Sequence, residues 1–91
     1  MRRFLIERDI PAVGTLDRDQ LRDAAKKSNE VLHALGPDIQ WVESYVAGDK
    51  IFCVYLATGE DIIQRHADMS GFPATKITEI RKKIDPTTAH S

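Results

Sequence analysis

Three glutamates that lie in alternating apolar runs are the first candidates for chemistry in this sequence. Glu7, Glu43 and Glu79 each lie in such a run, and Arg81 follows the last of them. If the runs are strands of one sheet, a side-chain period of two puts all four residues on the same face. Carboxylates gathered near an arginine can bind a hard metal ion, transfer protons, or form a salt-bridge network at an interface. The salt-bridge network is the commonest of these arrangements, and metal binding is the next.

The histidines and the single cysteine give weaker signals. His66 falls on the apolar side of a helical pattern, where a hydrogen-bonded histidine at the core edge is commoner than a ligand. Neutral imidazole is nevertheless a good ligand for nickel, zinc and copper. His33 falls in the last turn of a helix, where the dipole favours a cation, and no HExxH or CxxC motif is present. Cys53 has no basic neighbour in sequence, which predicts an inert core thiol.

Composition excludes several functions. The chain has 91 residues and a net charge of −1, with no basic stripe, so we expect no nucleic-acid partner. No apolar run approaches the roughly 20 residues of a membrane helix, and the N-terminus lacks the apolar region of a signal peptide. One cysteine excludes an intrachain disulfide. We therefore expect one cytoplasmic domain over residues 1–91, with a flexible tail at 87–91.

The clearest structural signal is a hairpin over residues 39–57. Two β-branched and aromatic runs flank Gly48-Asp49, a strong two-residue turn signal. A tight turn pairs Glu43 with Val54 and Trp41 with Leu56. Both faces of this hairpin are largely apolar, so we expect both to be covered.

The remaining patterns complete the fold. They predict a strand over 3–9, a helix between an Asp17–Gln20 capping box and Gly36-Pro37, a shorter helix from a Thr58–Asp61 capping pattern to Ser70-Gly71, and a strand over 76–84. The order β-α-β-β-α-β is that of an α+β ferredoxin-like sandwich. In this fold a four-stranded antiparallel sheet carries two helices on one face.

Alternation along the strands assigns side chains to the two faces of the sheet. On the helix side we expect Phe4, Ile6, Val42, Val46, Ile51, Cys53, Tyr55 and Ile80. On the other side, the open face, we expect Leu5, Glu7, Trp41, Glu43, Tyr45, Phe52, Val54, Leu56, Ile77, Glu79 and Arg81. An apolar face of this size is seldom left in water. A homodimer with its sheets back to back is the simplest way to cover it.

Several stretches resemble a known family. ERDIP, the hairpin QW…SYV…DKI.CVY, H…GFPA and IDPTT are similar to segments of a family of small nickel-binding proteins, formerly a domain of unknown function. The resemblance spans nearly the whole chain. It implies a ferredoxin-like homodimer that binds nickel near the dimer surface, with a role in sequestration or detoxification and no enzymatic activity.

The resemblance also suggests ligands for the metal. The matching positions are Glu7 in ERD, Glu43 in the hairpin and His66 before GFP. Family members often carry histidine at the second position, and a carboxylate there makes a harder site that is less selective for nickel. Glu7 and Glu43 belong to the open face whereas His66 starts from the helix side. The three can meet only around a sheet end or across a dimer, and two separate sites remain an alternative.

A second hypothesis comes from another class of protein. A dimeric α+β-barrel enzyme or small-molecule-binding protein of this fold uses a pocket between helices and sheet. His66, Tyr55 and Arg8 are then the residues of interest. This alternative requires an internal cavity of several hundred Å³ lined by few polar groups, as is usual for ligand sites.

Overall fold

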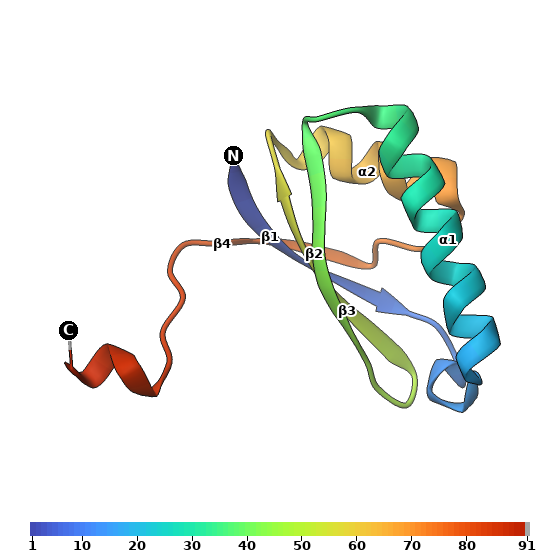
Figure 1. Cartoon of the computed structure of the whole chain (residues 1–91), viewed down its shortest axis with the longest axis horizontal. Coiled ribbons are helices and arrows are strands. Elements are labelled where there is room, and N and C mark those ends of the chain that lie inside the picture. Colours follow the sequence, from blue (N-terminus) through green and yellow to red (C-terminus); the bar gives the residue numbers. More distant parts are fainter. Residues whose placement is uncertain (91) are drawn as a thin grey trace.

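The computed structural model describes residues 1–90 and has the predicted ferredoxin-like α+β architecture (Figure 1). The four strands are β1 (Arg2–Asp9), β2 (Ile39–Val46), β3 (Lys50–Ala57) and β4 (Lys76–Ile80). They form one antiparallel sheet in the order β2-β3-β1-β4. Helices α1 (Arg18–Leu35) and α2 (Glu60–Ser70) lie together on one face of this sheet.

The two helices begin in different ways. Asp17 caps α1 by accepting from the backbone of Gln20 at 2.9 Å, and the Gln20 side chain accepts from the Asp17 backbone at 3.0 Å. This is the predicted capping box. The N-cap of α2 is Gly59 and makes no side-chain hydrogen bond, so the predicted Thr58 cap is wrong. Instead, two acidic residues in the first turn of α2 interact favourably with the positive end of its helix dipole.

The core lies between the helices and the central strands. Its buried cluster is Phe4, Ile6, Ile39, Cys53, Tyr55, Ala57 and Ile63. Leu32 and Leu35 of α1 pack against this cluster. The C-terminal half of α1 therefore fills the space above the sheet with large side chains.

The hairpin has the predicted turn and a register shift that was not predicted. The Ala47 backbone donates to Lys50 at 2.8 Å, and Glu43 lies opposite Val54 as expected. A β-bulge between Trp41 and Glu43 then pairs Trp41 with Tyr55 instead of Leu56. Because a bulge adds one residue to one strand, it exchanges the two faces beyond it.

Two expectations are wrong because of this bulge. Trp41 lies on the helix side rather than on the open face, and its indole donates to the Ser44 hydroxyl at 2.9 Å. Val42, which we expected in the core, is 46% exposed. Val46 lies on the helix side as predicted, but it is 44% exposed rather than buried in the core.

The faces of the last strand are also exchanged relative to the prediction. β4 ends at Ile80 rather than at residue 84, and it pairs with β1 so that Ile77 lies opposite Ile6 and Glu79 opposite Phe4. Ile77 and Glu79 therefore lie on the helix side and Ile80 on the open face. Isoleucines occur at both odd and even positions of this strand, so only the register against β1 decides which one faces the helices.

The C-terminal segment leaves the body of the protein. Residues Pro86–His90 form a short 3-10 helix, η2, that has no buried residue and extends away from the sheet (Figure 1). The flexibility expected for residues 87–91 stays a prediction, and Ser91 lies outside the described residues. Within residues 1–90, no helix is long and apolar enough to cross a membrane.

Candidate functional site

The carboxylates of the open face lie on strands that do not touch. Glu7 is on β1 opposite Phe52, and Glu43 is on β2 opposite Val54. β3 separates the two strands, so their backbones are about 10 Å apart. Glu7 is half-buried and lies 3.4 Å from the ammonium group of Lys50, while Glu43 is exposed.

The third expected carboxylate lies elsewhere. Glu79 is on the helix side and pairs with Arg2 at 2.8 Å, and Arg81 is exposed beyond the end of β4. The prediction that Glu7, Glu43, Glu79 and Arg81 cluster on one face is therefore wrong. It failed because the two faces of β4 are exchanged relative to the prediction.

His66 lies inside the protein. It is fully buried on α2, and its Nε2 is 3.1 Å from the Ser28 hydroxyl of α1. The sheet separates this ring from Glu7 and Glu43, so one protomer does not bring the three residues into one site. Among residues 1–90, no three histidine, cysteine or acidic side chains are grouped closely enough to hold a metal ion.

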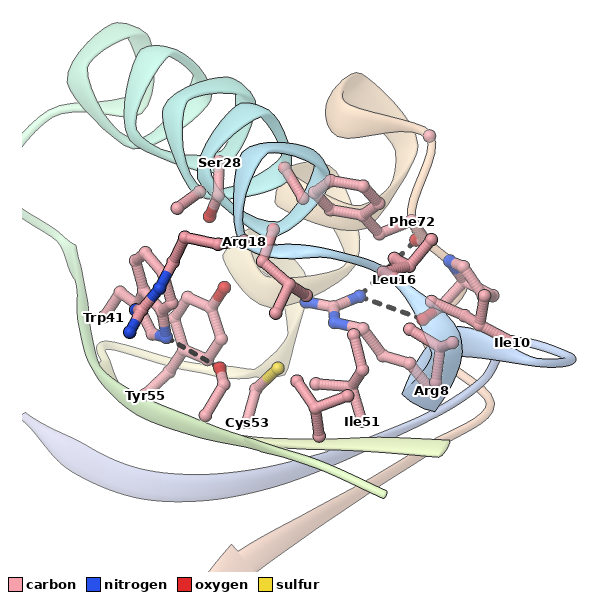
Figure 2. Close-up of a pocket in the computed structure, with 18 residues that line it drawn as sticks. Arg8, Ile10, Leu16, Arg18, Ser28, Trp41, Ile51, Cys53, Tyr55 and Phe72 are labelled. Atoms are coloured by element: carbon pink, nitrogen blue, oxygen red, sulfur yellow. Dashed lines mark hydrogen bonds between the residues drawn. The ribbon is translucent and has the colours of Figure 1, made fainter. Parts of the chain in front are cut away.

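A cavity of about 610 Å³ lies between the N-terminal half of α1 and the sheet (Figure 2). Ala24, Ala25 and Ser28 face it from α1, and because they are small they leave space that leucines fill farther along the helix. Trp41 and Ile51 line the hairpin side. The volume lies within the usual range of small-molecule sites.

Arg8 contributes a buried cation to this cavity. Its side chain is 2% exposed, and its Nη1 donates to the carbonyl oxygens of Pro73 at 2.9 Å and Phe72 at 3.4 Å. Its Nη2 is buried and has no hydrogen-bond partner within the described residues, 1–90. In Figure 2 the guanidinium lies amid the lining residues of the cavity. None of the ion pairs found among residues 1–90 involves Arg8.

Tyr55 lines the cavity with Arg8, and His66 lies next to Tyr55 without lining the cavity. Their rings lie 5.3 Å apart, and burial lowers the pKa of His66 to about 4, with a further contribution from the Arg8 charge. His66 is therefore neutral at pH 7. Burial raises the pKa of Tyr55, against the opposing effects of Ser28 and Arg8. Its hydroxyl is therefore protonated at neutral pH and can donate.

The sequence predicted part of this arrangement. Arg8, Tyr55 and His66 were the residues expected for a pocket; Arg8 and Tyr55 line the cavity, whereas His66 is buried beside Tyr55 and does not line it. Arg18 and Phe72, which also line the cavity, were not predicted. The small side chains in the apolar stripe of α1 were the available signal, because a stripe without large residues leaves space above a sheet.

Fold and site together define a small ferredoxin-like α+β protein with an apolar face on one side of its sheet and a cavity on the other. The chain belongs to a family of nickel-responsive proteins: the model described as "Nickel responsive protein SCO4226-like" matches residues 4–80. The family resemblance seen in the sequence is thereby confirmed.

One solved structure has the same fold. The crystal structure of SCO4226 from Streptomyces coelicolor A3(2) aligns with 90% of this chain and 99% of its own, with a TM-score of 0.75 and 18% sequence identity. At that identity the likeness shows the fold alone. A search of curated proteins found no match.

Proposed function

We propose that this protein is a homodimer that binds a divalent transition metal, nickel in the first instance, and sequesters it without chemical conversion. The nickel responsiveness named in the family description supports the choice of metal. The observation that carries the proposal is the open face of the sheet, which is apolar and bears both Glu7 and Glu43.

The open face favours a second copy of the chain as its cover. The half-buried apolar residues on it are Leu5, Phe52, Val54, Leu56 and Ile80. Tyr45 adds a ring that is 56% exposed. Neither helix covers this face. A twofold axis through a sheet face joins identical apolar patches, which is the usual geometry of homodimers.

A dimer also supplies the ligands that one protomer lacks. Twofold symmetry presents Glu7 and Glu43 twice, so four carboxylates line the interface. Such a donor set suits divalent metals but favours nickel less than imidazole does. We therefore expect modest selectivity among nickel, cobalt and zinc. His66 is left out of this proposal because its ring is buried on the other side of the sheet.

Lys50 is the expected competitor of the metal. Its ammonium group lies 3.4 Å from Glu7 and 3.5 Å from Asp9, and these carboxylates raise its pKa. A cation bound at Glu7 must displace this ammonium group. Replacing Lys50 with methionine should therefore strengthen metal binding.

The test is calorimetric titration of chelator-treated, untagged protein with nickel, zinc, cobalt and copper salts. We expect micromolar nickel binding at a fixed number of ions per dimer. The double variant Glu7→Gln/Glu43→Gln should weaken it by tenfold or more, since each lost carboxylate removes a charged ligand. The matched control Glu30→Gln/Glu60→Gln changes two exposed helix carboxylates and should bind as the wild type does.

Three results would contradict the proposal. These are heats no larger than those of an unrelated acidic protein, equal binding by the two double variants, and unchanged binding by Lys50→Met.

A variant Glu43→His should bind nickel more tightly than the wild type, because imidazole is the better nickel ligand.

A further inference from the structure

The cavity contains a positive charge that the described part of the chain does not neutralise. Arg8 is 2% exposed, and its Nη2 has no partner. The two carbonyl groups that accept from Nη1 satisfy part of the guanidinium but bring no negative charge. A buried ion without a counter-ion is costly, and such ions are normally paired. An anion is therefore the missing partner.

The rest of the cavity wall fits an apolar molecule. Most of its lining side chains are aliphatic or aromatic, among them Leu21, Trp41, Ile51 and Phe72. Among residues 1–90, no aspartate or glutamate lines the wall, and its second cation, Arg18, is exposed. Aliphatic and aromatic side chains with a few polar groups are typical of small-molecule sites.

We propose that this cavity binds a small organic acid, whose carboxylate is held by Arg8 and the Tyr55 hydroxyl and whose apolar body lies against α1 and the hairpin. The site is on the opposite side of the sheet from the carboxylates of the metal proposal. It does not depend on that proposal.

The local chemistry favours a monocarboxylate over other ligands. A bound cation would be repelled by Arg8, and a neutral molecule would leave the positive charge of Arg8 without a counter-ion. A dianion such as a phosphate ester would bring one charge more than the single buried guanidinium neutralises. Tyr55 and Arg8 line the same cavity, and in Figure 2 the Tyr55 hydroxyl points towards the Arg8 guanidinium, so a carboxylate bound to Arg8 would meet it. Arg8 lines the cavity, and its Nη2 is buried with no hydrogen-bond partner among residues 1–90.

The experiment uses two probes that differ only in charge. Decanoate carries a carboxylate, and decanamide replaces it with a neutral amide of the same shape. Trp41 is the single tryptophan of the chain and lines the cavity, so its fluorescence reports occupation directly. Calorimetry supplies the stoichiometry. All titrations contain a chelator, which separates this test from metal binding.

Three variants locate the binding. Arg8→Met removes the charge and keeps an apolar chain of similar length. Ala25→Phe fills the cavity from α1 and leaves Arg8 in place. Ala34→Phe makes the same substitution at an exposed position of α1 and is the matched control.

The wild type should bind one decanoate per chain, at least about tenfold more tightly than decanamide, because hydrogen bonds to a charged group are strong. In Arg8→Met the two probes should bind within about twofold of each other. Ala25→Phe should bind neither probe, and Ala34→Phe should bind as the wild type does.

The proposal is overturned by equal affinity of the wild type for both probes, or by an unchanged preference in Arg8→Met. Binding that survives Ala25→Phe would place decanoate outside the cavity and would overturn the proposal as well. If Arg8→Met does not fold, the probe pair and the two alanine variants decide the result.

Discussion

At the scale of single residues, Arg8 and His66 are linked by burial. Both side chains lie within the core, and each retains a buried nitrogen without a partner: Nη2 of Arg8 and Nδ1 of His66. The positive charge of Arg8 lowers the pKa of His66 and so helps to keep that ring neutral. Each of these unpartnered polar nitrogens costs stability, and both residues lie beside or in the wall of the cavity. Such a cost to stability is typical of binding sites.

The first prediction concerns Arg8 and stability. Arg8→Met should raise the free energy of unfolding of the ligand-free protein by about 1 kcal/mol, since a buried unpaired charge is replaced by an apolar chain. Urea denaturation at pH 7 measures this change. If the free energy of unfolding of Arg8→Met were instead lower by more than about 1 kcal/mol, the hydrogen bonds from Arg8 to Phe72 and Pro73 would make it a structural residue.

The second prediction concerns His66 and pH. Its pKa is about 4 in the folded protein and 6.5 in the unfolded chain, so between these values the unfolded chain binds the proton. The contribution of neutral His66 to the free energy of unfolding is therefore fully present above pH 6.5. It falls by roughly 3 kcal/mol as the pH drops towards 4. Urea denaturation between pH 7 and 4.5 should show this loss in the wild type and a smaller one in His66→Gln. His33→Gln, which removes an exposed histidine, should retain the wild-type dependence.

At the scale of elements, the short 3-10 helix η1 (Val13–Thr15) connects β1 to α1 and contacts the turn of the hairpin. The Gly14 backbone donates to Gly48 at 2.9 Å. A Cβ on Gly14 would lie 2.5 Å from the Ala47 carbonyl oxygen, which is a clash with backbone. Val13 on the same turn lines the cavity, so this contact fixes one wall of the site.

The third prediction tests that contact. Gly14→Ala should lower the free energy of unfolding by about 1–3 kcal/mol, because η1 must move away from the hairpin. Gly48→Ala is the matched control, since a Cβ there meets no atom within 4 Å. Chemical denaturation of the two variants measures the difference. Equal free energies of unfolding for Gly14→Ala and Gly48→Ala would show that η1 can move away from the hairpin without loss of stability.

At the scale of the whole molecule, the sheet has one face under the helices and one face without cover. The C-terminal segment also extends away from the body, and Ile84 on it is 78% exposed (Figure 1). Both features favour contact with a second copy of the chain, because large exposed apolar surfaces mark interaction sites.

The fourth prediction concerns this assembly. Val54→Asp places a charge in the middle of the open face and should convert the proposed dimer into a monomer, with its fold retained. Sedimentation velocity gives the mass, and circular dichroism checks the fold. Asn29→Asp adds the same charge on the exposed side of α1 and should remain dimeric. A wild type that sediments as a monomer at high micromolar concentration would contradict the dimer.

The sequence by itself determined the order of the elements, the capping box of α1, the hairpin turn and the family. These features depend on residues close together in the chain, or on a periodicity that survives without tertiary contacts. The tertiary structure alone decided which face each side chain occupies beyond a bulge or on the last strand. Trp41 and Glu79 changed faces for this reason, because one residue of register reverses every side chain.

The candidate sites divide in the same way. Arg8, Tyr55 and His66 could be chosen from the sequence as chemically capable residues, and Glu7 and Glu43 as carboxylates of one face. Their grouping could not be derived, since it depends on how large side chains fill the space between layers. Small residues on α1 leave a cavity around Arg8, and the sheet separates His66 from the two glutamates. Packing in three dimensions, which no single stretch of sequence encodes, decides which of these groups meet.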